Sequence, residues 1–213
     1  MPNLGNDQFC FTEQAFSLEV EPRLPAPPLP GLAEAPAEPT PEGSFEKHWL
    51  KTLAHVLTEE IQELYSSEKM LGAIAPQIAD AASGKILRAF SEHDTEQNRE
   101  HLNRLAQIQQ MLGLAADGRV CLSMEGMILG LQETVQENRR GRDLDERLVG
   151  VLHRIKHFEV STYCGARDFA QLLGLEPVVI LLQKTLDEEL AMETRLANYL
   201  EMIIASSGES KWR

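Results

Sequence analysis

The sequence contains few of the residues that build β-sheets. Aromatic residues make up 6% of the 213 residues, and runs of β-branched residues are almost absent. Strands are enriched in both kinds of residue, whereas Leu, Ala, Glu and Gln, which are abundant here, favour helices. The composition therefore predicts an all-α fold, and the length is sufficient for one good core and a tail.

The features of membrane and secreted proteins are also lacking. No stretch is apolar enough to span a bilayer, and no basic segment followed by an apolar run indicates a signal peptide. The three cysteines, Cys10, Cys121 and Cys164, are odd in number and form no CxxC motif. This pattern fits free thiols in a reducing compartment, so we expect a cytoplasmic protein.

Positive charge is scarce. Lys and Arg number 20 against 33 Asp and Glu, which gives a formal net charge of −13. Nucleic acids are bound through clustered Lys and Arg, and anionic membrane surfaces also attract positive charge, so we expect neither as a partner. An acidic chain is compatible with a bound multivalent cation, although most acidic proteins bind none.

Proline is concentrated near the N-terminus, where eight of the eleven prolines lie between Pro22 and Pro41. This segment has no apolar periodicity, so we expect residues 1–44 to form an extended or disordered tail. The tail's partner, if it has one, is not indicated by the sequence. We expect residues 45–206 to form one helical domain and residues 207–213 a polar end.

Apolar residues recur at helical spacing in five segments of this domain. The expected helices cover about residues 44–82, 85–112, 123–138 and 144–173, and a last helix begins at 176–177. Pro76 is expected to kink the first helix because proline removes a backbone donor. The short third helix is apolar on one stripe, which the bundle or a second subunit should cover; that stripe comprises Met124, Met127, Ile128 and Leu131.

Carboxylates interrupt the apolar stripes of the long helices. In the last helix, Glu189 and Glu193 lie one turn apart on the expected buried side, and Glu68 and Glu159 fill core positions of the first and fourth helices. Burial of a carboxylate is costly unless it is paired or binds a cation. The pattern therefore indicates a polar layer inside the bundle.

The second helix contains an entirely polar stretch, EHDTEQNREH, at 92–101. His93 and Glu96, at i and i+3, share a face there. Counting on from His93 at helical spacing reaches Glu100, one residue short of His101. A one-residue π-bulge would correct this mismatch; the alternative is a helix that rotates its buried face.

Four carboxylates at one level of a bundle would repel each other unless a cation lay between them. The four are Glu68, Glu96, Glu159 and Glu189. This layout is typical of carboxylate-bridged sites for two metal ions, and carboxylates with imidazole suit iron or manganese. The alternative is a polar layer filled with water.

Five stretches resemble one family and occur in its order: QELYSSEKML (62–71), AFSEHDTEQ (89–97), CLSMEGMIL (121–129), KHFEVSTYCG (156–165) and LLQKTLDEEL (181–190). They resemble the ferritin-like stress-protein family of YciE and YciF over about residues 46–204. The resemblance implies a rubrerythrin-like, ferritin-like four-helix bundle with an added short helix. It also implies a homodimer and a site for two iron ions, or for manganese.

The resemblance implies a metal ligand set of Glu68, His93, Glu96, Glu159, Glu189 and Glu193. Glu68 and Glu159 would bridge the ions, His93 and Glu96 would bind one ion, and Glu189 with Glu193 would bind the other. Candidates to surround these ligands are Glu100, His101 and His157. No residue is assigned a catalytic role.

This sequence departs from the family pattern at several positions. Lys156 stands where the family often has a glutamate, Met192 replaces a histidine, and one extra residue lies between Glu96 and Leu102. Leu129 and Gly130 replace acidic residues. The departures predict a site with one ion or none as the alternative to two. The implied function is oxygen or peroxide chemistry in a stress response; the alternative is a non-catalytic scaffold with a degenerate metal site.

Overall fold

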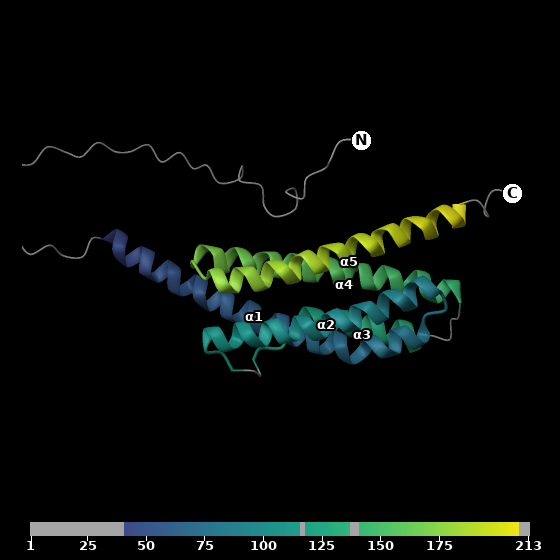
Figure 1. The fold of residues 1–213 in the computed structure, drawn as a ribbon, viewed down its shortest axis with the longest axis horizontal. Helices are drawn as coiled ribbons and strands as arrows, with labels where there is room; N and C mark the ends of the chain where they lie inside the picture. The colour runs from purple at the N-terminus through teal and green to yellow at the C-terminus, as the bar shows by residue number, and fades with distance from the viewer. Residues whose placement is uncertain (1–40, 116–117, 137–140, 209–213) are drawn as a thin grey trace, which may run out of the picture. The chain divides into compact units, whose positions relative to one another are not determined.

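The computed structural model describes residues 41–115, 118–136 and 141–208 of the chain. Within these residues it contains five helices and no strand (Figure 1): α1 (Pro41–Ala81), α2 (Lys85–Leu112), α3 (Leu122–Gln136), α4 (Arg142–Leu172) and α5 (Glu176–Gly208). The expected all-α fold is confirmed. The chain divides into the units Met1–His48 and Trp49–Arg213, and every site described below lies in the second unit.

The helices begin and end within a few residues of the expected positions. Helix α1 begins at Pro41 and continues as one helix through Pro76. Gly174 ends α4 as expected, because its positive φ of 68° is accessible to glycine. Residues 1–40 of the expected tail lie outside the described residues. The disorder of residues 1–40 therefore stays a prediction, whereas residues 41–44 belong to α1.

The turn between α1 and α2 is fixed to α4 by a buried carboxylate. The backbone N–H groups of Ser83 and Gly84 donate to the two oxygens of Asp145, at 2.9 and 2.7 Å. These bonds satisfy donors at the start of α2 that have no partner within the helix. The same contact therefore sets the position of α2 relative to α4.

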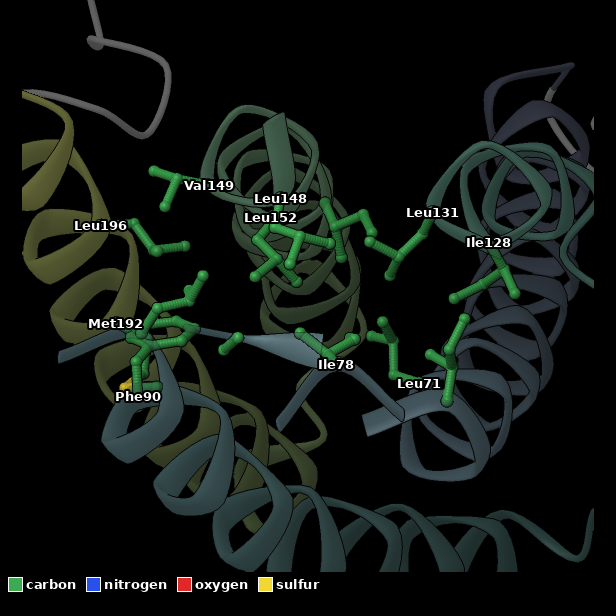
Figure 2. Close-up of a cluster of buried hydrophobic side chains, with 14 of the residues drawn as sticks. Leu71, Ile78, Phe90, Ile128, Leu131, Leu148, Val149, Leu152, Met192 and Leu196 are labelled. Atoms are coloured by element: carbon green, nitrogen blue, oxygen red, sulfur yellow. The ribbon is translucent and has the colours of Figure 1, made fainter. Parts of the chain in front are cut away.

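Helices α4 and α5 pack against each other most extensively, while α3 packs on α4 and α2 packs on α5. Apolar side chains from all five helices form one core cluster (Figure 2). The cluster includes Leu71, Phe90, Leu131, Leu152 and Met192, one from each helix. Four of these helices, α1, α2, α4 and α5, also contribute the residues of the polar layer that is described below.

The apolar stripe of α3 is covered by the bundle. Met124, Ile128 and Leu131 are buried in the core cluster, and Met127 packs against it. This stripe therefore gives no support for a second subunit. Leu122 and Leu129 are exposed on the same helix.

The expectation of free thiols holds for Cys121, which is free and buried. Among the described residues, no helix is long and apolar enough to cross a membrane.

Candidate metal centre

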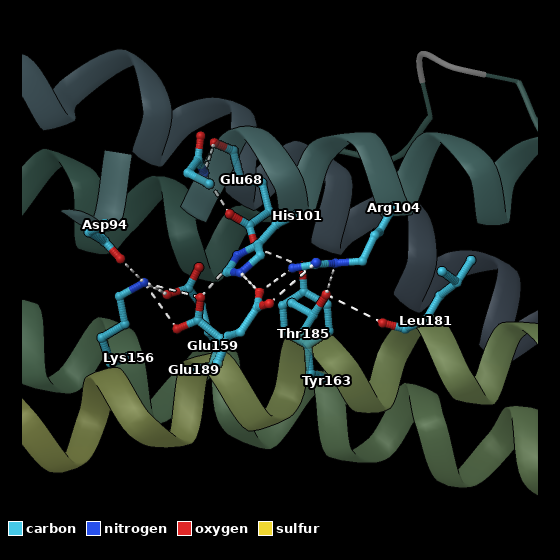
Figure 3. Close-up of polar contacts among 12 residues, drawn as sticks. Glu68, Asp94, His101, Arg104, Lys156, Glu159, Tyr163, Leu181, Thr185 and Glu189 are labelled. Atoms are coloured by element: carbon cyan, nitrogen blue, oxygen red, sulfur yellow. Dashed lines mark hydrogen bonds and ion pairs between the residues drawn. The ribbon is translucent and has the colours of Figure 1, made fainter. Parts of the chain in front are cut away.

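A layer of charged side chains interrupts the apolar core (Figure 3). Helices α1, α2, α4 and α5 contribute buried charged residues to it: Glu68, His101, Arg104, Lys156, Glu159 and Glu189. Each has at least one buried residue one turn before it and one turn after it in its helix. The sequence places these groups inside because the surrounding apolar stripe leaves them no exposed face.

The carboxylate of Glu68 receives hydrogen bonds from three side chains. Its Oε1 accepts from the Tyr163 hydroxyl at 2.6 Å and lies 3.1 Å from Nδ1 of His101. Its Oε2 accepts from Nδ2 of Asn98 at 2.6 Å, and that amide also donates to the Glu68 backbone carbonyl at 2.8 Å. Glu68 is therefore fixed in one orientation.

His101 connects α2 to α1 and α5. Its Nδ1 lies 3.1 Å from Glu68 Oε1 and 3.1 Å from Glu189 Oε1, while its Nε2 lies 3.0 Å from Glu188 Oε2. Burial alone would lower the pKa of His101. The hydrogen bonds and charges of Glu189 and Glu68 outweigh burial and raise the pKa to about 10. Without a metal ion the ring is therefore protonated.

Lys156 is a buried cation surrounded by carboxylates. Its Nζ lies 2.6 Å from Asp94 Oδ1, 2.9 Å from Glu159 Oε2 and 3.0 Å from Glu189 Oε2. Burial alone would lower the pKa of this ammonium, but the charges of Asp94, Glu159 and Glu189 raise it well above its usual value. Lys156 therefore remains charged inside the bundle.

Two neighbouring carboxyl groups have opposite pKa shifts. Burial and the charge of Glu189 raise the pKa of Glu159 well above its usual value. Burial would also raise the pKa of Glu189, but Lys156 and the hydrogen bond from His101 lower it to about 2. Neither oxygen of Glu159 has an aligned hydrogen-bond donor among the described residues. Of these two carboxyl groups, Glu159 is therefore the one that more readily takes up a proton and becomes uncharged.

Arg104 positions Glu188 beside His101. The guanidinium pairs with both carboxylate oxygens of Glu188. Its Nε donates to the Thr185 hydroxyl at 2.9 Å. This pair orients the acceptor for Nε2 of His101, which leaves Nδ1 facing Glu68 and Glu189.

Glu68, His101 and Glu189 offer three ligand atoms that all lie within 4.8 Å of one another. Ligand atoms that share one ion at right angles lie about 3 Å apart when each bond is about 2.1 Å. The two 3.1 Å separations from His101 Nδ1 fit this geometry. Two carboxylates and one imidazole suit iron or manganese, so this donor set fits one such ion.

The structure places the sequence-predicted site residues in two groups. Glu68, Glu159 and Glu189 meet in the buried layer. His93, Glu96 and Glu100 are exposed on α2 and do not reach it. His157 is exposed and pairs with the half-buried Glu193 at 2.7 Å between Nδ1 and Oε1, and neither residue contacts the layer residues through a described interaction. Metal binding by any of these residues stays a prediction.

Of the two alternatives for α2, the π-bulge is wrong, because the helix is α-helical throughout. Its buried face runs through Leu87, Asp94, Asn98, His101 and Leu105, and Asp94 is partly exposed. His93 lies one position off this face. Counting back from Leu105 at helical spacing gives His101, Asn98 and Asp94, so the sequence did contain the signal for the correct register.

Other members of the layer were not predicted. Asn98, Arg104, Glu188 and Tyr163 take part in its hydrogen bonds. Lys156 was noted only as a departure from a family pattern. Its burial follows from its place between Leu152 and Glu159 on the stripe of α4, which is the signal that could have identified it.

Known proteins resemble this chain over most of its length. Protein YciF of Escherichia coli strain K12 is 26% identical over 164 residues, which cover 76% of this chain and 98% of YciF. The crystal structure of that stress protein matches with a TM-score of 0.69 at 24% identity, covering 73% of this chain and 98% of that chain. YcfI from Rhodopseudomonas palustris matches with a TM-score of 0.65 at 25% identity, covering 68% of this chain and 92% of that chain.

A family model matches residues 52–208, and its description is Domain of unknown function (DUF892). This range covers more than half of the chain and contains the whole polar layer. The expected relationship to YciF-type proteins is confirmed by these matches. The chain belongs to the DUF892 family.

Proposed function

We propose that this protein binds one divalent iron or manganese ion between Glu68, His101 and Glu189. The observation that carries the proposal is the position of His101 Nδ1, 3.1 Å from an oxygen of each carboxylate. On the other side of the ring, Nε2 faces Glu188 at 3.0 Å. A metal-ligating histidine characteristically donates its second ring N–H to such a carboxylate.

The remaining residues of the layer orient these ligands. Tyr163 and Asn98 fix Glu68, and Lys156 fixes Glu189. An iron or manganese ion would supply redox chemistry toward oxygen or peroxide, and the name of the E. coli relative as a stress protein supports this direction. The homodimer belongs to the same proposal, and the family resemblance supports it. The cytoplasmic location also belongs to it, and its support is the cysteine pattern of the sequence.

Metal binding can be tested with two histidines of the same helix. In His101→Asn, we expect Mn²⁺ binding to the metal-stripped chain to weaken by at least 10-fold in calorimetry, because one ligand is lost. His93→Asn is the matched control, because His93 is exposed. Equal weakening in both variants, or in neither, would overturn the proposed ligand set.

The chemistry needs a separate measurement. Chain loaded with Fe²⁺ should consume hydrogen peroxide or oxygen faster than the same concentration of His101→Asn chain treated identically. Metal that binds but shows no change of oxidation state on exposure to peroxide or oxygen would leave a structural metal site and remove the redox function.

A scaffold role is the second candidate, and the charge pairing of the layer favours it. Lys156 contacts Asp94, Glu159 and Glu189, and Arg104 pairs with Glu188. Cations from the chain itself therefore balance much of the buried negative charge. A scaffold predicts that neither iron nor manganese raises the melting temperature, whereas an ion that binds only the folded state must raise it.

A further inference from the structure

The carboxylates of the layer form two positions for a cation. One lies between Glu68, His101 and Glu189, where the ligand atoms are within 4.8 Å of one another. The other lies between Asp94, Glu159 and Glu189, at distances of 2.6, 2.9 and 3.0 Å from Nζ of Lys156. The second position is therefore filled by an ammonium group of the chain itself.

Glu189 is shared by the two positions. Its Oε1 lies 3.1 Å from His101 Nδ1, and its Oε2 lies 3.0 Å from Lys156 Nζ (Figure 3). A carboxylate that binds one cation through each oxygen is the bridging element of a two-metal carboxylate site. Here the cations that it bridges are one candidate metal position and one lysine.

The arrangement does not fit a second divalent ion. Nζ already lies within 3.0 Å of an oxygen of each carboxylate that would bind such an ion. An ion bound to the same oxygens would lie beside a buried positive charge, and like charges repel strongly where water is excluded. The ammonium also cannot turn away to solvent, because the Lys156 side chain is only 3% exposed.

We propose that the ammonium group of Lys156 takes the place of the second metal ion, so that this centre holds one divalent ion instead of two. The inference rests on the proposed function for the ion at Glu68, His101 and Glu189. It assigns Asp94 and Glu159 to the ammonium, and it makes Lys156 the residue that sets the number of ions.

The test counts Mn²⁺ ions in the full-length chain after chelator treatment and reloading with Mn²⁺ alone. Elemental analysis and calorimetry should give one ion per wild-type chain and two per Lys156→Gln chain, because the substitution leaves Asp94, Glu159 and Glu189 without their cation. Lys184→Gln is the matched control, because Lys184 is exposed on α5; it should bind one ion. If Lys156→Gln does not fold, Lys156→Glu provides the second variant, since it adds a carboxylate ligand.

The outcomes separate this inference from the proposed function. Two ions in the wild-type chain, or an equal number in the wild-type chain and the folded Lys156 variant, would overturn the role of Lys156. No ion in the wild-type chain would overturn the proposed function, whereas a gain of one ion in the variant would still support the inference. If neither variant folds, electron paramagnetic resonance of the Mn²⁺-loaded wild-type chain decides: an isolated ion supports the inference, and two coupled ions overturn it.

Discussion

Asn98 of α2 packs directly over Gly72 of α1. A Cβ atom added at Gly72 would lie 2.5 Å from Oδ1 of Asn98, closer than side chains approach one another. The absence of a side chain at Gly72 therefore gives Asn98 the space from which its amide donates to the Glu68 carboxylate and backbone carbonyl. One glycine thus helps to position a metal-ligand candidate through the side chain of Asn98.

Gly72→Ala is expected to displace Asn98 and break both of its bonds to Glu68. Losing them costs roughly 2–4 kcal/mol, and the better helix propensity of alanine returns about 1 kcal/mol. We therefore expect the free energy of unfolding to fall by about 1–3 kcal/mol in urea denaturation. Gly150→Ala is the control, because a Cβ there meets nothing within 4 Å; it should be neutral or stabilising, and equal stability of the two variants would refute the packing argument.

Tyr163→Phe removes the hydroxyl that donates to Glu68 at 2.6 Å. A hydrogen bond to a charged group is worth about 1.5–3 kcal/mol, so the unfolding free energy should fall by that amount. Mn²⁺ affinity should fall roughly 10-fold or more, because Glu68 loses one of its orienting partners. Tyr65→Phe, at a partly exposed position of α1, is the control. Unchanged affinity in Tyr163→Phe would show that Tyr163 does not position Glu68 for metal.

The stability of the metal-free protein should depend on pH through His101. Its pKa is raised from 6.5 to about 10 in the fold, so the folded state binds this proton more tightly than the unfolded state does. The contribution is fully present below pH 6.5 and is lost as the pH rises through about 10. The urea concentration at the midpoint of unfolding of the metal-free protein should therefore decrease as the pH is raised from 6.5 to about 10.

His101→Asn is the control for this pH dependence. The variant lacks the titrating ring, so its unfolding free energy should fall less steeply over the same pH range. Identical slopes in the variant and the wild type would assign the pH dependence to other groups. The comparison needs chelator throughout, because a bound ion would compete with the proton for Nδ1.

The sequence was sufficient to predict the helices and part of the layer. Apolar spacing located all five helices, and it identified Glu68, Glu159 and Glu189 as buried because apolar residues flank each of them. The predicted register of α2 is wrong because every residue of 92–101 is polar, so no apolar residue marks the buried face within the stretch; counting back from the buried Leu105 gives Asp94 in place of His93. Pairings such as that of Arg104 with Glu188 join different helices, and a single sequence contains no signal for them.

The last prediction contrasts the two carboxylates that contact Lys156 from α4 and α5. Burial raises the pKa of Glu159, whereas Lys156 and His101 lower that of Glu189 to about 2. Glu159→Gln should therefore change the stability of metal-free protein little or increase it, since an amide replaces a carboxyl that is readily uncharged. Glu189→Gln should cost about 3–5 kcal/mol, because it leaves Lys156 and His101 without their shared buried partner.

Urea denaturation of both variants in chelator measures this contrast, and reloading with Mn²⁺ extends it. Both variants remove one formal charge and conserve side-chain volume, so each controls for the other. If Glu159→Gln loses as much stability as Glu189→Gln, then Glu159 is ionised and contributes equally to the pairing with Lys156. With Mn²⁺ present, Glu189→Gln should also lose the rise in melting temperature, whereas Glu159→Gln should retain it, because the ligand atoms that lie within 4.8 Å of one another belong to Glu68, His101 and Glu189.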